Sequence, residues 1–102
     1  MTNTTGLSEK DTDKIKSVLA GHPEIGKAIL YGSRAKGNYK PASDIDITLV
    51  GENLDLNMLQ LIEEQLEDLL LPYNFDISIL HQIENPGLLD HIERVGLVFW
   101  ER

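Results

Sequence analysis

Two stretches of the chain alternate between apolar and polar residues, a pattern typical of half-buried β-strands. In the first, Asp44–Val50, the apolar side chains fall on one face and the polar ones on the other. The apolar residues are Ile45, Ile47 and Leu49, and the polar residues are Asp44, Asp46 and Thr48. The second, Phe75–Leu80, repeats the pattern with Asp76 and Ser78 on its polar face. Each stretch predicts a strand that packs on one side and is free for function on the other.

A third strand and a helix are predicted before these two stretches. Ser8–Asp11 resembles a capping box, and apolar residues at helical spacing follow it until Gly21–Pro23 stops the helix. Lys27–Tyr31 is a short apolar run that ends at Gly32. Such a run predicts a buried strand.

Two further helices are expected in the second half of the chain. Asp55 predicts the cap of a helix that runs to about Leu71, and Asn85 the cap of a helix that stops at Gly96. The apolar stripes expected on them are Leu59, Ile62, Leu66, Leu69 and Leu70 on the first, and Leu88, Leu89, Ile92 and Val95 on the second. The tail Leu97–Trp100 is predicted to be extended and packed.

The order of these elements predicts an α+β (α/β) fold with a small mixed sheet and helices packed against it. The helix between the second and third strands implies a right-handed crossover, which makes those strands parallel. The short loop between the first and second strands implies an antiparallel pair. We therefore expect the second strand in the middle of the sheet, within one domain spanning residues 1–102, of which residues 1–7 are expected to be flexible.

Composition and charge narrow the classes of partner. The chain of 102 residues has no cysteine, which fits a reducing compartment. Its formal net charge of −8 disfavours binding to a nucleic-acid backbone. No apolar run approaches the roughly 18 residues of a membrane span, and the N-terminus lacks a signal-peptide core. We therefore expect a cytoplasmic protein that binds neither membrane nor nucleic acid.

Basic residues are concentrated in one loop of this acidic chain. Four of the nine Lys and Arg residues lie between Ile25 and Ser43, where no acidic residue occurs. They are Lys27, Arg34, Lys36 and Lys40. A locally positive loop fits a small anion such as a triphosphate, although a solvated surface loop explains the charges about as well.

Three carboxylates are the candidate metal ligands. Asp44 and Asp46 lie on one face of a strand, with α-carbons about 6.5–7 Å apart, and Asp76 holds the matching position on a neighbouring strand. Three unpaired carboxylates would repel one another and raise at least one pKa, a cost that a bound cation removes. Mg²⁺ commonly combines one or two carboxylates with substrate phosphates. Two such ions, about 3.5–4 Å apart, would stabilise the attacking and leaving oxygens of a displacement at phosphorus.

The turn Gly32-Ser33 is the candidate phosphate site. Gly32 allows close approach of the backbone, and Ser33 is predicted to cap a short helical turn, residues 34–36, which Gly37 ends. Arg34 and Lys36 are candidates for neutralising phosphate oxygens, and the sequence leaves open which of them faces the site. An Asp-x-Asp pair or a Gly-Ser turn alone is weak evidence, whereas their fixed spacing with a third Asp is specific.

These motifs resemble those of the minimal nucleotidyltransferase (MNT) domains of the polymerase-β superfamily. The resemblance rests on residues 32–37 followed by Ser43-Asp44-Ile45-Asp46, and it covers about residues 25–80. It implies a polymerase-β-like fold, Mg²⁺ held by Asp44 and Asp46 with Asp76 completing the triad, and triphosphate contacts from Gly32 and Ser33. It leaves open whether Asp76 is a metal ligand, the base that deprotonates the acceptor, or both.

The resemblance also implies a partner and a reaction. Single-domain MNT proteins typically accompany a small helical HEPN protein in toxin–antitoxin pairs, where the MNT antitoxin is similar to an enzyme that transfers AMP from ATP to a tyrosine of the toxin. Two alternatives stay open: an antitoxin that acts by binding alone, and a nucleotidyltransferase for a small molecule such as an antibiotic. The nucleobase, the acceptor and any homo- or hetero-oligomer are not fixed by the sequence.

Other residues that often carry chemistry are expected to have ordinary roles here. His22, His81 and His91 show no metal-ligand spacing and are expected at the surface or in loops. Tyr31, just before the Gly-Ser turn, is expected in the core or at a sheet edge.

Overall fold

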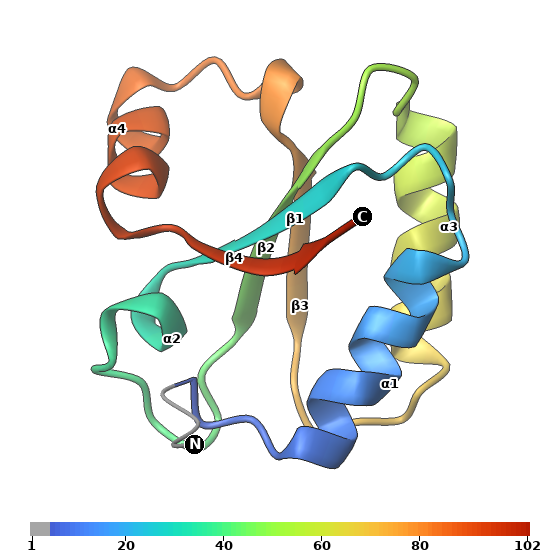
Figure 1. Cartoon of the computed structure of the whole chain (residues 1–102). Helices are drawn as coiled ribbons and strands as arrows, with labels where there is room; N and C mark the ends of the chain where they lie inside the picture. Colours follow the sequence, from blue (N-terminus) through green and yellow to red (C-terminus); the bar gives the residue numbers. More distant parts are fainter. Residues whose placement is uncertain (1–4) are drawn as a thin grey trace.

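The computed structural model describes residues 5–102 and contains one mixed sheet within that range (Figure 1). Its strands lie in the order β3-β2-β1-β4, with β2 antiparallel to β1 and parallel to β3. Their bounds are β1 Lys27–Tyr31, β2 Ile45–Val50, β3 Phe75–Ile79 and β4 Leu97–Glu101. The fold class, both strand pairings and the central place of β2 are confirmed. The predicted extended tail is the edge strand β4, which pairs antiparallel with β1.

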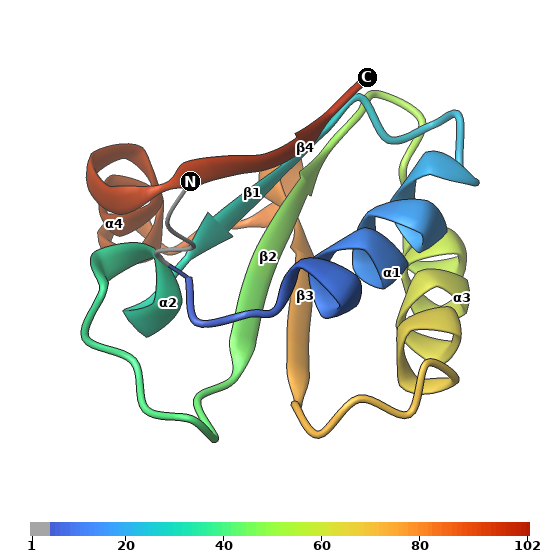
Figure 2. The same cartoon turned by 60° about the horizontal axis from the view of Figure 1, so that its bottom comes forward.

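Two helices cover one face of the sheet, as Figures 1 and 2 show. They are α1, Glu9–Ala20, and α3, Leu56–Glu67, and both contribute to the main core. From α1 and α3 the core takes Ile15, Leu19, Ile62 and Leu66, and from the strands it takes Ala28, Leu30, Ile45, Ile47, Leu49, Ile77 and Ile79. Because these strand residues alternate with polar ones, the opposite face of the sheet is left for the site.

Three shorter helical elements remain, and the last of them lies over the opposite face, where Ile92 and Ile29 line one groove. These are α2, Ser33–Lys36, the 3-10 helix η1, Leu80–Gln82, and α4, Pro86–Val95. Helix α4 contacts β1, and Ile92 is the residue of α4 that is fully buried. The rest of the stripe predicted for this helix is only partly covered, and Leu89 is 36% exposed. Within residues 5–102, no helix has the length and apolar character needed to cross a bilayer.

Three of the four predicted helix caps are present. The side chains of Ser8, Asp55 and Asn85 accept hydrogen bonds from backbone N–H groups in the first turns of α1, α3 and α4. Such caps satisfy N–H groups that have no partner within the helix. Local polar residues therefore fix where these helices begin.

Helix α3 ends earlier than predicted. Its last residue is Glu67 rather than a residue near Leu71, and Leu70 has a left-handed backbone with φ 57°. Leu70 is 89% exposed, so its predicted place on the buried stripe is wrong. Leu59 and Leu69 are partly buried against the core, whereas Ile62 and Leu66 are fully buried.

The N-terminal segment joins the core sooner than the sequence indicates. We expect flexibility over residues 1–7, of which residues 1–4 lie outside the described part of the chain. Leu7, at the end of that segment, is 1% exposed and belongs to the main core. The packed part of the chain therefore includes Leu7.

Candidate functional site

The acidic residues of β2 and β3 meet on the open face of the sheet. Asp46 and Asp76 are register partners in the parallel pair, so their side chains emerge on the same face. Asp44 lies one residue before the start of β2. Burial, followed by the negative charges of Asp76 and Asp44, raises the pKa of Asp46 to about 6. Asp46 therefore interacts electrostatically with both of the other carboxylates.

The carboxylates are not preassembled into a closed metal cage. Among residues 5–102, no group of three Asp, Glu, His or Cys side chains converges closely enough to hold an ion by itself. Asp44 and Asp76 are exposed, and Asp46 is half-buried. The donor chemistry fits a hard divalent cation, because a cation would offset both the burial and the repulsion that raise the Asp46 pKa. The remaining ligands would then be phosphate oxygens and water, as is usual for Mg²⁺.

Gly32 lies directly against Asp46. Its backbone has φ 75° and ψ −157°, a combination open essentially to glycine alone. A Cβ atom at this position would collide with the Asp46 carboxylate. The carbonyl of Gly32 accepts the N–H of Lys36 at 3.1 Å, which begins α2, and Gly37 ends this helix with φ 86°. The Gly-Ser turn and the acids are thus neighbours, as the sequence suggests.

Ser33 has a different local role from the one predicted. The N-cap of α2 is Gly32, with no side-chain cap, and Ser33 is the first helical residue. Its side chain is therefore not committed to capping. Since α2 is a single turn, the backbone N–H groups at its start have no intrahelical acceptor. Lys36, at the end of the turn, is exposed.

Replacing Gly32 with alanine tests this close approach. We expect Gly32→Ala to lower the free energy of unfolding by at least about 1 kcal/mol more than Gly37→Ala, which is the matched control. Both changes put a side chain at a positive φ, but a Cβ at Gly32 collides with Asp46, whereas a Cβ at Gly37 meets no atom within 4 Å. Urea unfolding of the two variants measures the difference. Equal losses would show that Gly32 does not lie against Asp46.

Arg34 is buried among backbone carbonyls and two tyrosine rings. Its guanidinium donates to the carbonyl of Thr5 at 2.9 Å, to that of Pro41 at 3.2 Å, and to that of Ser43 at 2.9 and 3.1 Å. The same group lies over the rings of Tyr39 and Tyr73, at 5.3 and 4.8 Å from their centres.

Arg34 is 1% exposed, so no part of it is free for a phosphate. The predicted phosphate contact from Arg34 is at odds with this burial. Through its hydrogen bonds to backbone carbonyls, Arg34 instead stabilises the loop between the Gly-Ser turn and the acids.

Two residues behind the turn carry roles that the sequence analysis missed. His91, on α4, accepts a hydrogen bond at Nε2 from the N–H of Gly32 at 3.1 Å. Its ring meets that of Tyr31 edge-on, at 6.1 Å between centres. Tyr31 is buried, as expected, whereas His91 is not simply a surface residue. No local signal marks His91, because its partner lies 59 residues away along the chain.

Tyr31 also borders the acids. Burial raises the pKa of its phenol, the charges of Asp76 and Asp46 raise it further, and the neighbouring Ser78 hydroxyl opposes the rise. Tyr31, on β1, is the register partner of Asp46, on β2. The acids are therefore flanked by a phenol that stays protonated at neutral pH.

A second polar pair lies one step further along the same face. Thr48 and Ser78 are register partners, and both hydroxyls are buried without a hydrogen-bond partner among the described residues. Ser78 lies beside the Tyr31 phenol but outside hydrogen-bond geometry. A buried hydroxyl without a partner costs stability.

Removing the hydroxyl of Thr48 is expected to stabilise the protein. Thr48→Val keeps the shape of the side chain and should raise the free energy of unfolding by about 1 kcal/mol. The control, Thr48→Ser, keeps the hydroxyl and loses a methyl group, so it should lower the same quantity by about 1 kcal/mol. Urea unfolding at pH 7 measures both. A destabilising Thr48→Val would mean that the hydroxyl has a partner in solution.

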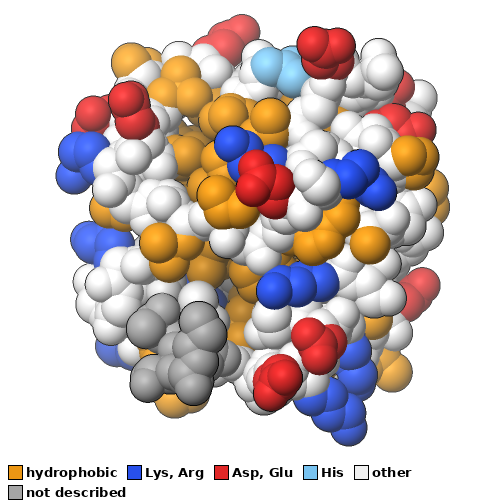
Figure 3. Space-filling view, in the orientation of Figure 1, with side chains coloured by type: hydrophobic (Ala, Val, Ile, Leu, Met, Phe, Trp, Pro, Cys, Tyr) orange, Lys and Arg blue, Asp and Glu red, His pale blue; other side chains and the backbone are white. Residues whose placement is uncertain are grey.

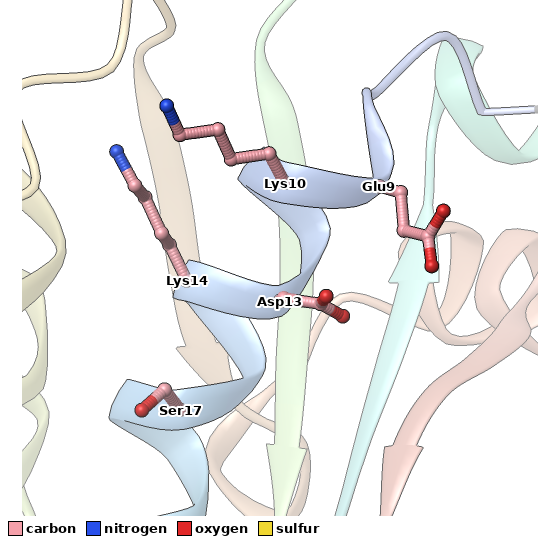
Figure 4. Close-up of a pocket in the computed structure, with 5 residues that line it drawn as sticks. All are labelled: Glu9, Lys10, Asp13, Lys14 and Ser17. Atoms are coloured by element: carbon pink, nitrogen blue, oxygen red, sulfur yellow. The ribbon is translucent and has the colours of Figure 1, made fainter.

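Two hollows of the surface lie away from the acids. The first runs along α1 and is lined by Glu9, Lys10, Asp13, Lys14 and Ser17. Figure 4 shows that its lysines point to one side of the helix and its acids to the other, so no charges converge there. The second is an apolar groove between α4 and β4 that includes Leu89, Ile92 and Val98. Figure 3 shows apolar side chains gathered in that region.

Solved structures of toxin–antitoxin complexes contain chains whose fold is similar to that of this chain. A crystal structure of a toxin–antitoxin with AMP-PNP contains a chain of 24% identity, with a TM-score of 0.72, over 89% of this chain and 73% of that one. The MNT antitoxin bound to the tri-AMPylated HEPN toxin of Shewanella oneidensis is 20% identical, with a TM-score of 0.70, over 94% and 74%. The toxin–antitoxin MntA–HepT matches at 21% identity and a TM-score of 0.68, over 93% and 74%.

These structural likenesses show a shared fold. No curated protein matches the sequence. The sequence profile of the family described as polymerase beta, nucleotidyltransferase, matches residues 13–102, which is most of the chain. With the acids of β2 and β3 meeting beside a Gly-Ser turn, this match confirms the resemblance: the chain is a nucleotidyltransferase and belongs to the polymerase β nucleotidyltransferase family.

Proposed function

We propose that the protein transfers AMP from ATP, with Mg²⁺, onto a hydroxyl of a HEPN-type partner, in the role of an antitoxin. The acceptor we propose is a tyrosine, and the setting is the cytoplasm. The observation that carries the proposal is the register pairing of Asp46 with Asp76 directly beside Gly32. This arrangement supports the combination of cation, triphosphate and acceptor at one place on the open face of the sheet.

The three acids are the proposed ligands for Mg²⁺, with two ions as the expected number. Asp46 is central, since it interacts with both Asp44 and Asp76. Bound magnesium would neutralise phosphate charge and stabilise the leaving pyrophosphate. The register pairing holds Asp46 and Asp76 on neighbouring strands, so a rigid sheet fixes their spacing.

The turn and α2 are proposed to hold the triphosphate. Gly32 brings the backbone close, the free hydroxyl and amide of Ser33 donate to phosphate oxygens, and Lys36 supplies an exposed positive charge. Arg34 is left out of this set because its guanidinium is buried among loop carbonyls. Its role is to keep the loop in place around the turn.

The proposed step is a displacement at the α-phosphorus. The acceptor oxygen forms a bond to this phosphorus, the bond to the pyrophosphate oxygen breaks, and pyrophosphate leaves. The proton of the acceptor hydroxyl passes to a carboxylate oxygen of Asp76, whose side chain is exposed. Tyr31 stays protonated beside the acids and takes no part in the transfer.

A protein acceptor is supported by two observations. Solved structures with a similar fold include an MNT antitoxin with a tri-AMPylated HEPN toxin and a toxin–antitoxin with AMP-PNP. This chain also exposes apolar side chains near α4 and β4, where Leu97 is 41% and Val98 is 58% exposed. Exposed apolar patches are typical of surfaces that bind other proteins. The net charge of −8 disfavours a nucleic-acid acceptor.

The test is transfer of label from ATP to the helical protein encoded beside this one. The purified pair with Mg²⁺ should give label on the partner, and chelation of the metal should stop it. The double variant Asp44→Ala/Asp46→Ala should bind the partner but transfer nothing and fail to neutralise it. If the double variant neutralises the partner as well as the wild type, the protein acts by binding alone. Transfer to a small molecule but not to the partner would favour an antibiotic-type enzyme.

A further inference from the structure

His91 connects helix α4 to the nucleotide turn. The N–H of Gly32 donates to Nε2 of His91 at 3.1 Å, across 59 residues of sequence. Because a backbone N–H can only donate, Nε2 must be the unprotonated nitrogen of a neutral ring. The proton of the imidazole therefore lies on Nδ1.

Three groups contact Gly32: the imidazole of His91, the backbone N–H of Lys36 and the carboxylate of Asp46. Its N–H is bound by His91, its carbonyl accepts the N–H of Lys36, and its α-carbon lies against the carboxylate of Asp46. The bond to His91 fixes the peptide between Tyr31 and Gly32, just before the residue whose φ of 75° turns the chain into Ser33. Loss of this bond would free the turn to relax away from the acids.

His91 is itself well fixed. Its ring meets the buried ring of Tyr31 edge-on, and its neighbour Ile92 anchors α4 with 5% exposure. Asp90, the adjacent acid on the helix, is paired with Arg94 at 2.8 Å and does not compete for the imidazole. The ring is therefore a rigid acceptor aimed at Gly32.

We propose that His91 is a positioning residue for the nucleotide: its neutral imidazole holds the Gly32-Ser33 turn in the shape that receives the triphosphate. This role rests on the proposed nucleotidyltransferase function. It adds a residue outside the strand–turn–strand motif, on a helix that also borders the apolar groove. A merely structural role would instead consist of packing against Tyr31.

Two variants distinguish the positioning role from the packing role, because the two roles predict opposite orders of nucleotide affinity for them. His91→Gln keeps an acceptor near the place of Nε2 and loses the ring, whereas His91→Phe keeps the ring and loses the acceptor. Affinity for AMP-PNP with Mg²⁺ is measured by calorimetry on the full chain. We expect His91→Phe to weaken binding about tenfold and His91→Gln to stay within about threefold of the wild type. His81→Gln and His81→Phe are the controls, since His81 is exposed on η1.

The outcomes distinguish this inference from the function on which it rests. If His91→Phe binds AMP-PNP as well as the wild type, or better than His91→Gln, His91 only packs and the positioning role is overturned while the proposed function stands. If the wild type binds no nucleotide, both are overturned. Nitrogen NMR of the imidazole gives an independent check without ligand: an unprotonated Nε2 is expected, and a protonated Nε2 would overturn the hydrogen bond itself.

Discussion

Replacing Asp46 with asparagine is expected to abolish the proposed AMP transfer and, at the same time, to stabilise the metal-free protein. Transfer should fall by about 10³-fold or more, since a ligand to the cation contributes several kcal/mol to the transition state. The gain in stability follows from the pKa of Asp46, which is raised from 3.8 to about 6 by burial and by the charges of Asp76 and Asp44.

The sign of the stability change depends on pH. Between about pH 3.8 and 6 the folded protein keeps a proton on Asp46 that the unfolded chain has lost, so the Asp46 contribution to stability falls as pH rises through this range. Above pH 6 the ionised carboxylate costs about 1–2 kcal/mol, after discounting for its partial exposure. Asp46→Asn removes this cost at pH 8 and changes little below pH 3.8.

Urea unfolding in a chelator, at pH 8 and at pH 3.5, measures this effect. The control is Glu84→Gln, an exposed acid outside the site, which should change the free energy of unfolding by less than about 0.5 kcal/mol at either pH. An Asp46→Asn protein no more stable than the wild type at pH 8 would contradict the electrostatic account of the acids.

The second large effect is expected at Arg34. Arg34→Ala should lower the free energy of unfolding by about 4 kcal/mol, because the carbonyls of Thr5, Pro41 and Ser43 lose their donor and a buried cavity remains. Urea unfolding and the melting temperature measure this loss.

Lys36 is the matched control two residues away. It is exposed, so Lys36→Ala should change stability by less than about 0.5 kcal/mol while weakening ATP binding severalfold. Arg34 is thus expected to stabilise the fold, and Lys36 is expected to bind the nucleotide. A stable Arg34→Ala protein with reduced ATP affinity would restore Arg34 to the phosphate site and contradict its buried role.

The strands and the candidate site could be predicted from the sequence because their signals are local. Alternation in Asp44–Val50 and Phe75–Leu80 fixes which side chains share a face, and the crossover rule makes these strands parallel neighbours. Those two facts bring Asp46 and Asp76 together. The helix starts were predictable for the same reason, since each cap lies within a few residues of the N–H group that it satisfies.

What could not be predicted depends on distant contacts. The charge of Arg34 suggests a phosphate partner, but its burial is decided by Tyr39, Tyr73 and the carbonyl of Thr5, none of which forms a recognisable pattern with it. His91 gives no signal either, because only the packing of α4 on β1 brings it to Gly32.

The end of α3 and the strand β4 could not be predicted for a different reason. The leucines after Glu67 continue an apolar run up to Pro72, so the pattern extends the helix although the backbone turns left-handed at Leu70. The tail Leu97–Trp100 has no alternation that marks a strand, and its pairing with β1 depends on an edge left open by residues far earlier in the chain.

Titration with Mn²⁺, as a spectroscopic substitute for Mg²⁺, in the presence of AMP-PNP tests the central claim most directly: the carboxylates of β2 and β3 hold one cation site together. We predict that Asp46→Asn and Asp76→Asn each weaken Mn²⁺ binding at least about tenfold, whereas Glu84→Gln binds as the wild type does. An Asp76→Asn protein that binds Mn²⁺ with the affinity of the wild type would contradict the claim, because the site would then belong to the Asp44–Asp46 strand alone.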